Sequence, residues 1–467
     1  MRFKRLLQLG WVAASCQMAC NWNDFNSVLD KAPVVSFDNG SSTTGSVIGL
    51  ALPPPAPGGK VSARMLVSRR DSTYLALAEF DKDGKASIGE ASGADLANLG
   101  STPVTSMAAL DPSKPDSPIL LGTPSYGHDT VPSSQAAPGR VSLLSMTTLA
   151  DGTATLSVQP AFAGTDHFGI AVASGRVTDL SGAPQFVAVS DVAVQVLGAD
   201  ARTPGASTGC QNVSFADSSG GLVAPRALAV ADLLPGGLDE IVLGGLGRVI
   251  FIQYDPTTQG LVCSPLVLTP PAASAGFGDS LAVADFDGDG HMDLAVGAPL
   301  DHVYVYFGPL VGSDATAIPS VSIRSSGGSA FGRRIAVYTV PPAPGTVPPV
   351  LPHSQLLVAD PQAAVGSRAG AGKVVLLNVA RAAQEQDAAS LTITTVFDSN
   401  ENAPAGVFGG ESLGSVWFDT RSCNPAGGIA LPLWVASGTK MLTFFNYPTN
   451  TTVLPPAPVA DPRCFGK

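Results

Sequence analysis

An acidic stretch in the second half of the chain has the residue types and spacing for ion binding. Residues 285–293 read DFDGDGHMD, so carboxylates alternate with other residues, among them two glycines. Alternate side chains converge only if the backbone coils tightly, and Gly288 and Gly290 permit that coil because glycine reaches positive φ without steric cost. Carboxylates this close repel one another unless a cation lies between them. Calcium fits such a loop, since it takes about six to eight oxygen ligands from carboxylates, carbonyls and water.

This spacing predicts a set of five calcium ligands. Four are side chains and the fifth is a backbone carbonyl, that of His291; the side chains are those of Asp285, Asp287, Asp289 and Asp293. An EF-hand would need an acidic residue at its twelfth position, which is Val296 in this chain. An ordinary solvated Asp-Gly turn is the alternative.

A weaker acidic stretch lies near the front of the chain. Residues 75–84 can be overlaid on residues 281–290, and this overlay predicts a second ion site. Its candidate ligands are Glu79, Asp81, Asp83 and Ser87. The alternative is a hairpin turn without an ion.

The elements around the main acidic stretch recur along the chain. Apolar runs at 281–284 and 303–307 predict a strand before the loop and another after it. A copy lies 53 residues earlier, where Leu228–Asp232 matches Leu281–Asp285 and Glu240 matches Asp293. The loop of that copy lacks the carboxylates, so no ion is expected there. Weaker copies are found at 99–144, 168–189, 331–377 and 408–438.

Two short motifs flank the main acidic stretch. Phe277-Gly278 precedes it and Gly297-Ala298-Pro299 follows it. With the acidic loop between them, these motifs resemble the FG-GAP repeat of integrin α-subunits. The resemblance implies a β-propeller, a calcium-binding hairpin loop and recognition of ligands by loops on one flat face.

The repeats and the composition favour one large all-β domain. The chain has 51 glycines and 39 prolines among 467 residues, with 45% hydrophobic and 13% charged residues, so it is turn-rich and expected to fold. About seven units are counted. The sequence therefore predicts a seven-bladed β-propeller of the FG-GAP/integrin-α type over residues 46–447, within the usual range of about four to eight blades.

The N-terminus has the pattern of an export signal. A basic start is followed by an apolar run over residues 6–15, which is too short to span a bilayer. Small residues precede both Cys16 and Cys20, which resembles a bacterial lipoprotein signal with lipidation at Cys20 (or Cys16). An ordinary secretory signal is the alternative. We expect a signal peptide at 1–20, a flexible spacer at 21–45 and a C-terminal tail at 448–467.

The remaining cysteines predict two disulfides in an oxidising compartment. They are Cys210, Cys263, Cys423 and Cys464. Proximity along the chain suggests the pairs 210–263 and 423–464, although three connectivities are possible.

The sequence favours a binding module over an enzyme. It contains no Gly-x-Ser-x-Gly elbow, His-Glu-x-x-His helix or phosphate-loop pattern, and its five histidines are scattered. A net charge of −11 disfavours nucleic acid and anionic membrane surfaces as partners. We expect non-enzymatic binding or adhesion to a protein or glycan at the outer membrane or cell surface, with contact to the membrane through the lipid anchor only. A propeller-based hydrolase or lyase, or a structural component of an envelope assembly, are the alternatives.

Overall fold

The computed structural model of the chain is built almost entirely of β-strands, as the composition predicts. It describes the strands and most of the turns of residues 103–339, and shorter segments on either side. The described residues are 34–36, 44–51, 61–69, 75–81, 86–90, 99, 103–112, 114–124, 139–148, 154–164, 166–179, 182–207, 215–216, 222–223, 225–245, 247–270, 276–300, 302–311, 319–325, 330–339, 354–364, 369–370, 372–379, 381, 385–397, 413–419, 430–437 and 441–446.

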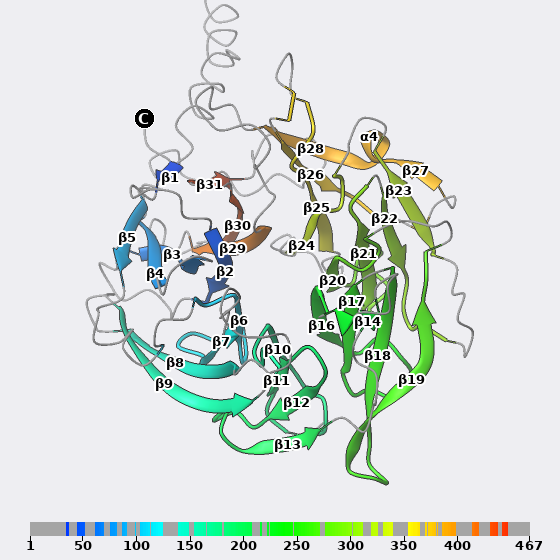
Figure 1. Ribbon diagram of the computed structural model, residues 1–467. Helices are drawn as coiled ribbons and strands as arrows, with labels where there is room; N and C mark the ends of the chain where they lie inside the picture. The colour runs from blue at the N-terminus through cyan, green and yellow to red at the C-terminus, as the bar shows by residue number, and fades with distance from the viewer. Residues whose placement is uncertain are drawn as a thin grey trace, which may run out of the picture.

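Six blades of a propeller each contain four antiparallel strands in chain order, and in blade five β27 (Glu385–Asp387) joins the sheet as a fifth, parallel strand (Figure 1). The first three blades consist of β2 (Thr44–Leu50), β3 (Val61–Arg69), β4 (Leu75–Asp81) and β5 (Ala86–Glu90); β6 (Ser106–Ala109), β7 (Ile119–Pro124), β8 (Gly139–Thr148) and β9 (Ala154–Gly164); and β10 (Ala171–Gly175), β11 (Gln185–Val189), β12 (Val194–Leu197) and β13 (Pro204–Ser207). Blades four to six consist of β16 (Ala227–Ala231), β17 (Glu240–Gly245), β18 (Arg248–Asp255) and β19 (Gly260–Leu268); β20 (Ser280–Ala284), β21 (Asp293–Ala298), β22 (His302–Tyr306) and β23 (Val321–Arg324); and β24 (Arg334–Thr339), β25 (Ser354–Asp360), β26 (Lys373–Leu377) and β28 (Thr392–Phe397).

The other elements complete or decorate this arrangement. A composite sheet pairs β1 (Val34–Ser36) with β31 (Met441–Asn446), followed by β30 (Ala430–Ser437) and β29 (Leu413–Asp419). A short hairpin consists of β14 (Phe215–Ala216) and β15 (Leu222–Val223), and a crossover between blades contains β27 (Glu385–Asp387) and the one-turn helix α4 (Ala388–Leu391).

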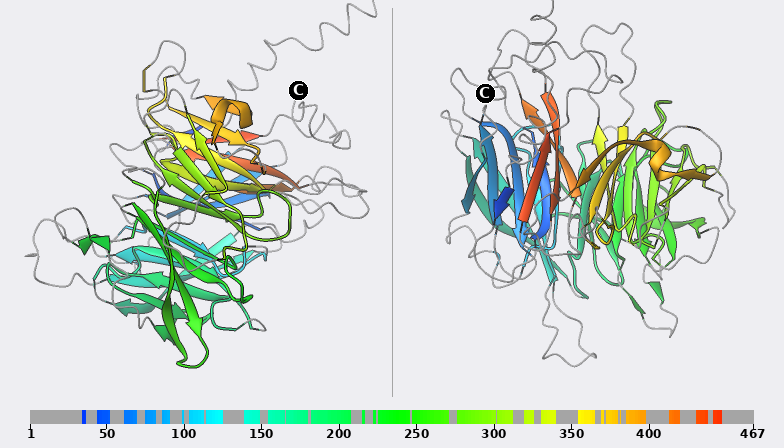
Figure 2. Two further views of the ribbon diagram at one scale, coloured as in Figure 1. Left: turned by 90° about the vertical axis from the view of Figure 1, so that its right-hand side faces the viewer. Right: turned by 90° about the horizontal axis from the view of Figure 1, so that it is seen from above.

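The first strand of each blade lies nearest the centre (Figure 1), and these strands contact one another in sequence from β2 to β24. Figure 2 shows the same sheets from the side and from above. β29 of the composite sheet contacts both β24 and β2, so the ring closes through this sheet.

The prediction of a seven-bladed propeller is corrected, because the structure shows six blades and the unit at 408–438 supplies only β29 and β30 of a separate composite sheet. β1 falls within the spacer predicted at 21–45, so that segment contributes a strand. The predicted signal peptide at 1–20 and the tail at 448–467 lie outside the described residues.

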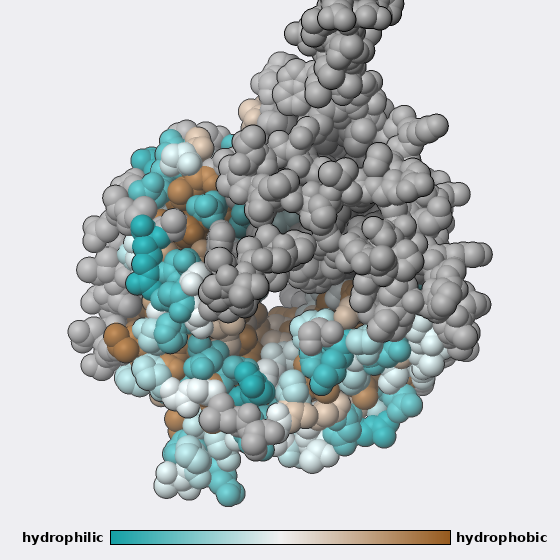
Figure 3. Space-filling model, turned by 180° about the vertical axis from the view of Figure 1, so that it is seen from behind, coloured by the Kyte–Doolittle hydropathy of each residue, from teal (hydrophilic) through white to brown (hydrophobic). Residues whose placement is uncertain are grey.

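The cores lie between the blades, as expected for small sheets that cannot bury both faces alone. One apolar layer joins blades four and five through residues such as Phe251, Phe277 and Tyr304, and another joins blades five and six through Phe286 and Phe331. Comparable layers lie between blades one and two, two and three, and three and four. On the face in Figure 3, described apolar side chains gather near the central opening, while hydrophilic ones are frequent around the rim.

The flanking motifs of the repeat hold neighbouring blades together. Gly278, at φ 88°, donates its backbone N–H to the Gly297 carbonyl oxygen of the same blade, at 3.0 Å. A Cβ on Gly244 of blade four would lie 2.4 Å from the Gly278 carbonyl oxygen, and one on Gly297 would lie 2.3 Å from that of Gly332 in blade six. The glycine in the second strand of one blade therefore packs against the Phe-Gly turn of the next, and a side chain would push them apart.

Two further features bear on the predicted cellular context. Cys263, in β19, forms a disulfide; the other five cysteines lie outside the described residues. In the part of the chain that the structure describes, no helix has the length and apolar character needed to cross a membrane.

Candidate metal centre

The acidic loop connects the first two strands of blade five. β20 ends at Ala284 and β21 begins at Asp293, with Ala284 and Asp293 paired across the hairpin. Gly288 and Gly290 adopt φ values of 82° and 89°, which L side chains rarely adopt. These two glycines produce the tight coil that the sequence predicts. Phe286 points inward from the same loop and is fully buried between blades five and six.

Three of the predicted ligands converge in this loop. One carboxylate oxygen from each of Asp285, Asp287 and Asp289 lies within 4.8 Å of the others. Asp285 also organises the loop backbone, since its two oxygens accept the N–H groups of Gly288 at 2.6 Å and Gly290 at 2.9 Å. Hard oxygen donors gathered at one point form the ligand type that calcium prefers.

The other two predicted ligands stand apart from this cluster. His291 is exposed and donates its backbone N–H to Asp289 at 2.9 Å, while coordination by its carbonyl stays a prediction. Asp293 is fully buried, and its two oxygens accept the N–H groups of Phe286 at 2.7 Å and Gly308 at 2.9 Å. Asp293 therefore fastens the base of the hairpin.

The environment of Asp293 disfavours its charged form. Burial raises the pKa of Asp293 from 3.8 to about 6, and the nearby carboxylates of Asp287 and Asp285 push it in the same direction. The two backbone N–H bonds oppose this shift, because they stabilise the carboxylate.

A cation from elsewhere in the chain contacts the carboxylate cluster. The guanidinium of Arg381 donates from Nε to Asp287 and from Nη2 to Asp289, and it lies over the ring of Phe307 at 5.2 Å from the ring centre. The hydrogen bond to Asp287 raises the pKa of Arg381, with the charges of both carboxylates adding to the shift. Because a positive group occupies the cluster, the donor set fits a cation.

The equivalent hairpin of blade four has the same framework without the cluster. Glu240, at the position of Asp293, accepts the N–H groups of Leu233 at 2.8 Å and Leu234 at 3.0 Å. Leu233, at the position of Phe286, is fully buried, and Leu234 takes the position of Asp287. Two buried leucines therefore stand where blade five has Phe286 and Asp287.

The front acidic stretch occupies a different place in its blade. Its strands are β4 and β5, the third and fourth of blade one, whereas β20 and β21 are the first and second of blade five. The overlay of residues 75–84 on 281–290 therefore joins non-equivalent hairpins. Glu79 forms an ion pair with the fully buried Arg64 at 2.7 Å and lies opposite Ser87 across the strands. Of the other candidates, Asp81 ends β4 and Asp83 lies outside the described residues.

Sequence reasoning missed a charged cluster at the opposite end of the first strands. Asp279, which is only 4% exposed, accepts both hydrogen bonds from Arg226 at 2.9 and 2.7 Å, and Arg333 lies 3.8 Å away. These residues precede β20, β16 and β24, so one carboxylate links three consecutive blades. Each of these three residues directly precedes the first strand of its blade. An alignment of the repeats could therefore have indicated the cluster.

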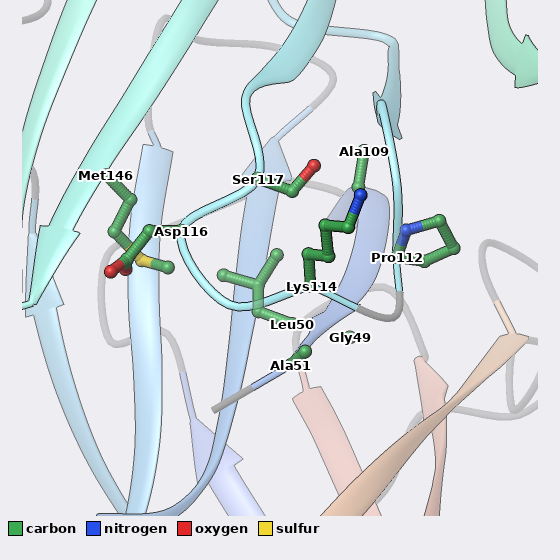
Figure 4. A pocket seen from close by; sticks show the side chains of 9 residues that line it. All are labelled: Gly49, Leu50, Ala51, Ala109, Pro112, Lys114, Asp116, Ser117 and Met146. Carbon is green, nitrogen blue, oxygen red and sulfur yellow. The ribbon is translucent and has the colours of Figure 1, made fainter. Parts of the chain in front are cut away.

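Two smaller features lie in the first three blades. His167 Nδ1 lies 2.5 Å from Asp191 at the start of blade three. A cavity of about 10 Å³, enough for one water molecule, lies between blades one and two, lined by Leu50 and Met146 from the strands and by Lys114 and its neighbours from the loop after β6 (Figure 4). This cavity is too small for an organic substrate.

Comparison with known proteins gives a family match over the same segment. The FG-GAP repeat family matches residues 277–308, which run from the Phe-Gly turn through the acidic loop to the end of β22. The chain thus contains an FG-GAP repeat within a β-propeller. No curated protein matches the chain. A solved chain from the crystal structure of BBS1N in complex with ARL6DN is 11% identical, with 88% of this chain and 98% of that chain covered and a TM-score of 0.41.

Proposed function

We propose that this protein is an exported, lipid-anchored, calcium-binding β-propeller that serves as a non-enzymatic binding module for a protein or glycan at the cell surface. The convergence of Asp285, Asp287 and Asp289 in the matched FG-GAP segment carries the calcium part of the proposal. The integrin-like role and the anchor rest on the resemblance of the sequence motifs.

The proposed ion has a structural task. Three carboxylates gathered in one turn repel one another, and a divalent cation between them would offset that repulsion and fix the loop. The remaining ligands would be carbonyls and water, since calcium takes about six to eight oxygens. The loop projects from one end of blade five, so a fixed loop would present a defined surface at that end of the propeller.

The binding role follows from the architecture and is an analogy, because a fold supports many functions. A propeller holds the turns between its strands at two ends while the strands form a rigid support. Loops held in this way are common sites of recognition.

The calcium site is tested by thermal unfolding of the metal-free chain with and without calcium. An ion that binds only the folded loop stabilises it by about 2.7 kcal/mol at one hundred times its Kd, so the Tm of the wild type should rise. Asp287→Ala should remove most of the rise. Asp232→Ala is the matched control, because Asp232 holds the position of Asp285 in the blade-four hairpin that lacks the cluster. An unchanged wild-type Tm in saturating calcium would refute the site.

The binding role is tested by cross-linking intact cells and capturing the tagged chain. We expect one specific protein or glycan to be captured with wild type in calcium, and several-fold less with Asp287→Ala. Asp232→Ala should capture as much as the wild type. Equal capture by all variants would show that partner binding does not depend on the acidic loop. The absence of any specific partner would contradict the binding role.

A further inference from the structure

The segment after β26 crosses from blade six to the outer edge of blade five. β27 pairs in parallel with β23, the last strand of blade five, through the partners Ser322–Glu385, Ile323–Gln386 and Arg324–Asp387. The chain then forms α4 and returns to blade six as β28 (Figure 1). We call residues 378–391 the strap, because they tie the two blades together.

The strap is fastened at both ends and through α4. The N–H of Asn378 donates to the carbonyl of Leu391 at 3.0 Å, which brings its two ends together. Ala388 of α4 is buried in the apolar layer between blades five and six. Arg381 therefore extends from a segment that is itself anchored to the blade with the acidic loop.

Arg381 brings its guanidinium to the acidic loop from 94 residues away in sequence. It donates to one oxygen of Asp287 and one of Asp289, two of the three carboxylates that converge. Phe307 provides an aromatic face under the same guanidinium, an arrangement that attracts a cation. The side chain of Arg381 is still 58% exposed, so it can leave the loop without unpacking a core.

We infer that Arg381 is an intramolecular competitor for the cation of this loop, so that Arg381 and a bound calcium ion exclude each other. Both would use the carboxylates of Asp287 and Asp289, and two positive groups at one cluster repel each other. Without an ion, Arg381 offsets the repulsion among the carboxylates. This inference rests on the proposed calcium site and goes beyond it, because it assigns a regulatory contact to the strap.

Competition has two measurable consequences. The apparent calcium affinity of the wild type is reduced by the fraction of molecules in which Arg381 occupies the loop. Because coupling between two sites is reciprocal, calcium binding must in turn weaken the attachment of the strap near Arg381.

The inference is tested by calcium titration of the full-length, metal-free chain by calorimetry. Arg381→Gln should bind calcium about threefold to tenfold more tightly than the wild type. We expect this range because the ion pair of Arg381 is weakened by its exposure to solvent but strengthened by its two hydrogen bonds. Arg381→Lys keeps the charge without the fork and should lie between them. Arg202→Gln is the matched control, since Arg202 is an exposed arginine of blade three that bonds Gln159 and should leave the affinity unchanged.

A second readout follows the strap itself. Hydrogen exchange of the amides of residues 385–391 should become faster when calcium is added to the wild type, and it should be indifferent to calcium in Arg381→Gln. Thermal unfolding without calcium confirms that each variant is folded before titration.

The outcomes separate this inference from the proposed function. If the wild type and Arg381→Gln bind calcium equally, the competition is refuted and the calcium site stands. If only Arg381→Gln binds, the competition is supported in its strongest form, while calcium binding by the wild type, and with it that part of the proposed function, is refuted. If neither binds, both the site and the competition are refuted.

Discussion

The inner hairpins of blades four and five use one framework to hold two different loops. Each has a buried apolar residue at the turn, Leu233 or Phe286, and a buried carboxyl that fastens the backbone, Glu240 or Asp293. They differ at the next position, where blade four has buried Leu234 and blade five has Asp287. The framework is thus sufficient to close the hairpin. The clustered carboxylates of blade five are not needed for closure, so they point to another role.

A single segment after β22 supports both hairpins. The N–H of Gly308 donates to Asp293 at 2.9 Å, while the N–H of Leu310 donates to the carbonyl of Leu233 at 2.7 Å. Leu310 also packs with Leu233 and Leu234 in the layer between the blades. In blade four the loop is closed by apolar packing, whereas in blade five Asp287, at the position of Leu234, pairs with Arg381. The comparison teaches that an acidic loop and an apolar loop can share one scaffold.

The largest expected effect is on the free energy of unfolding, and it distinguishes the framework shared by both hairpins from the proposed ion site. Phe286→Ala and Leu233→Ala each remove a fully buried side chain and should lower the free energy of unfolding by about 3–5 and 2–5 kcal/mol respectively. Because Phe286 lies within the acidic loop, only Phe286→Ala should also weaken calcium binding. Denaturant unfolding and calcium titration check the pair. If Leu233→Ala lost calcium affinity as well, the two hairpins would have to be coupled through residues 308–310.

Sequence reasoning predicted most where several motifs coincide. The strands of blade five, its buried aromatic residues Tyr304 and Tyr306, and the equivalent hairpin of blade four lie where the repeat places them. The reason is physical: the Phe-Gly turn and the glycine of the second strand are each required by close contact between blades.

Sequence reasoning was wrong where only one pattern was available. An apolar strand followed by an acidic stretch fits any hairpin of a blade, so the pattern matches residues 75–84 to the first hairpin, although Leu75–Asp81 form β4, the third strand of blade one. Asp293 stays a predicted ligand, but its burial and the two backbone N–H groups that its oxygens accept could not be read from the acidic spacing. Arg381 could not be predicted, since the crossover that carries it to blade five has no local signal.

The smallest effect concerns the carboxyls that fasten the two hairpins. Burial raises the pKa of Asp293 to about 6 and also raises the pKa of Glu240. A group with a raised pKa in the folded state contributes stability that is complete below its unfolded pKa and is lost as pH rises through the folded pKa. For Asp293 this window runs from about 4 to about 6 and corresponds to a loss on the order of 2 kcal/mol.

Unfolding free energies measured from pH 4 to 7 should therefore fall less steeply in Asp293→Asn and in Glu240→Gln than in the wild type. Calcium adds the discriminating measurement. An ion bound by Asp285 and Asp287 would cancel their repulsion of Asp293 and lower its pKa. The pH range over which Asp293 affects the free energy of unfolding would then move to lower pH, whereas the range for Glu240 would not change. The shift should be modest, because these two charges are the smallest causes of the raised pKa of Asp293. Equal shifts for both carboxyls would indicate that calcium acts on the whole propeller instead of on the blade-five loop.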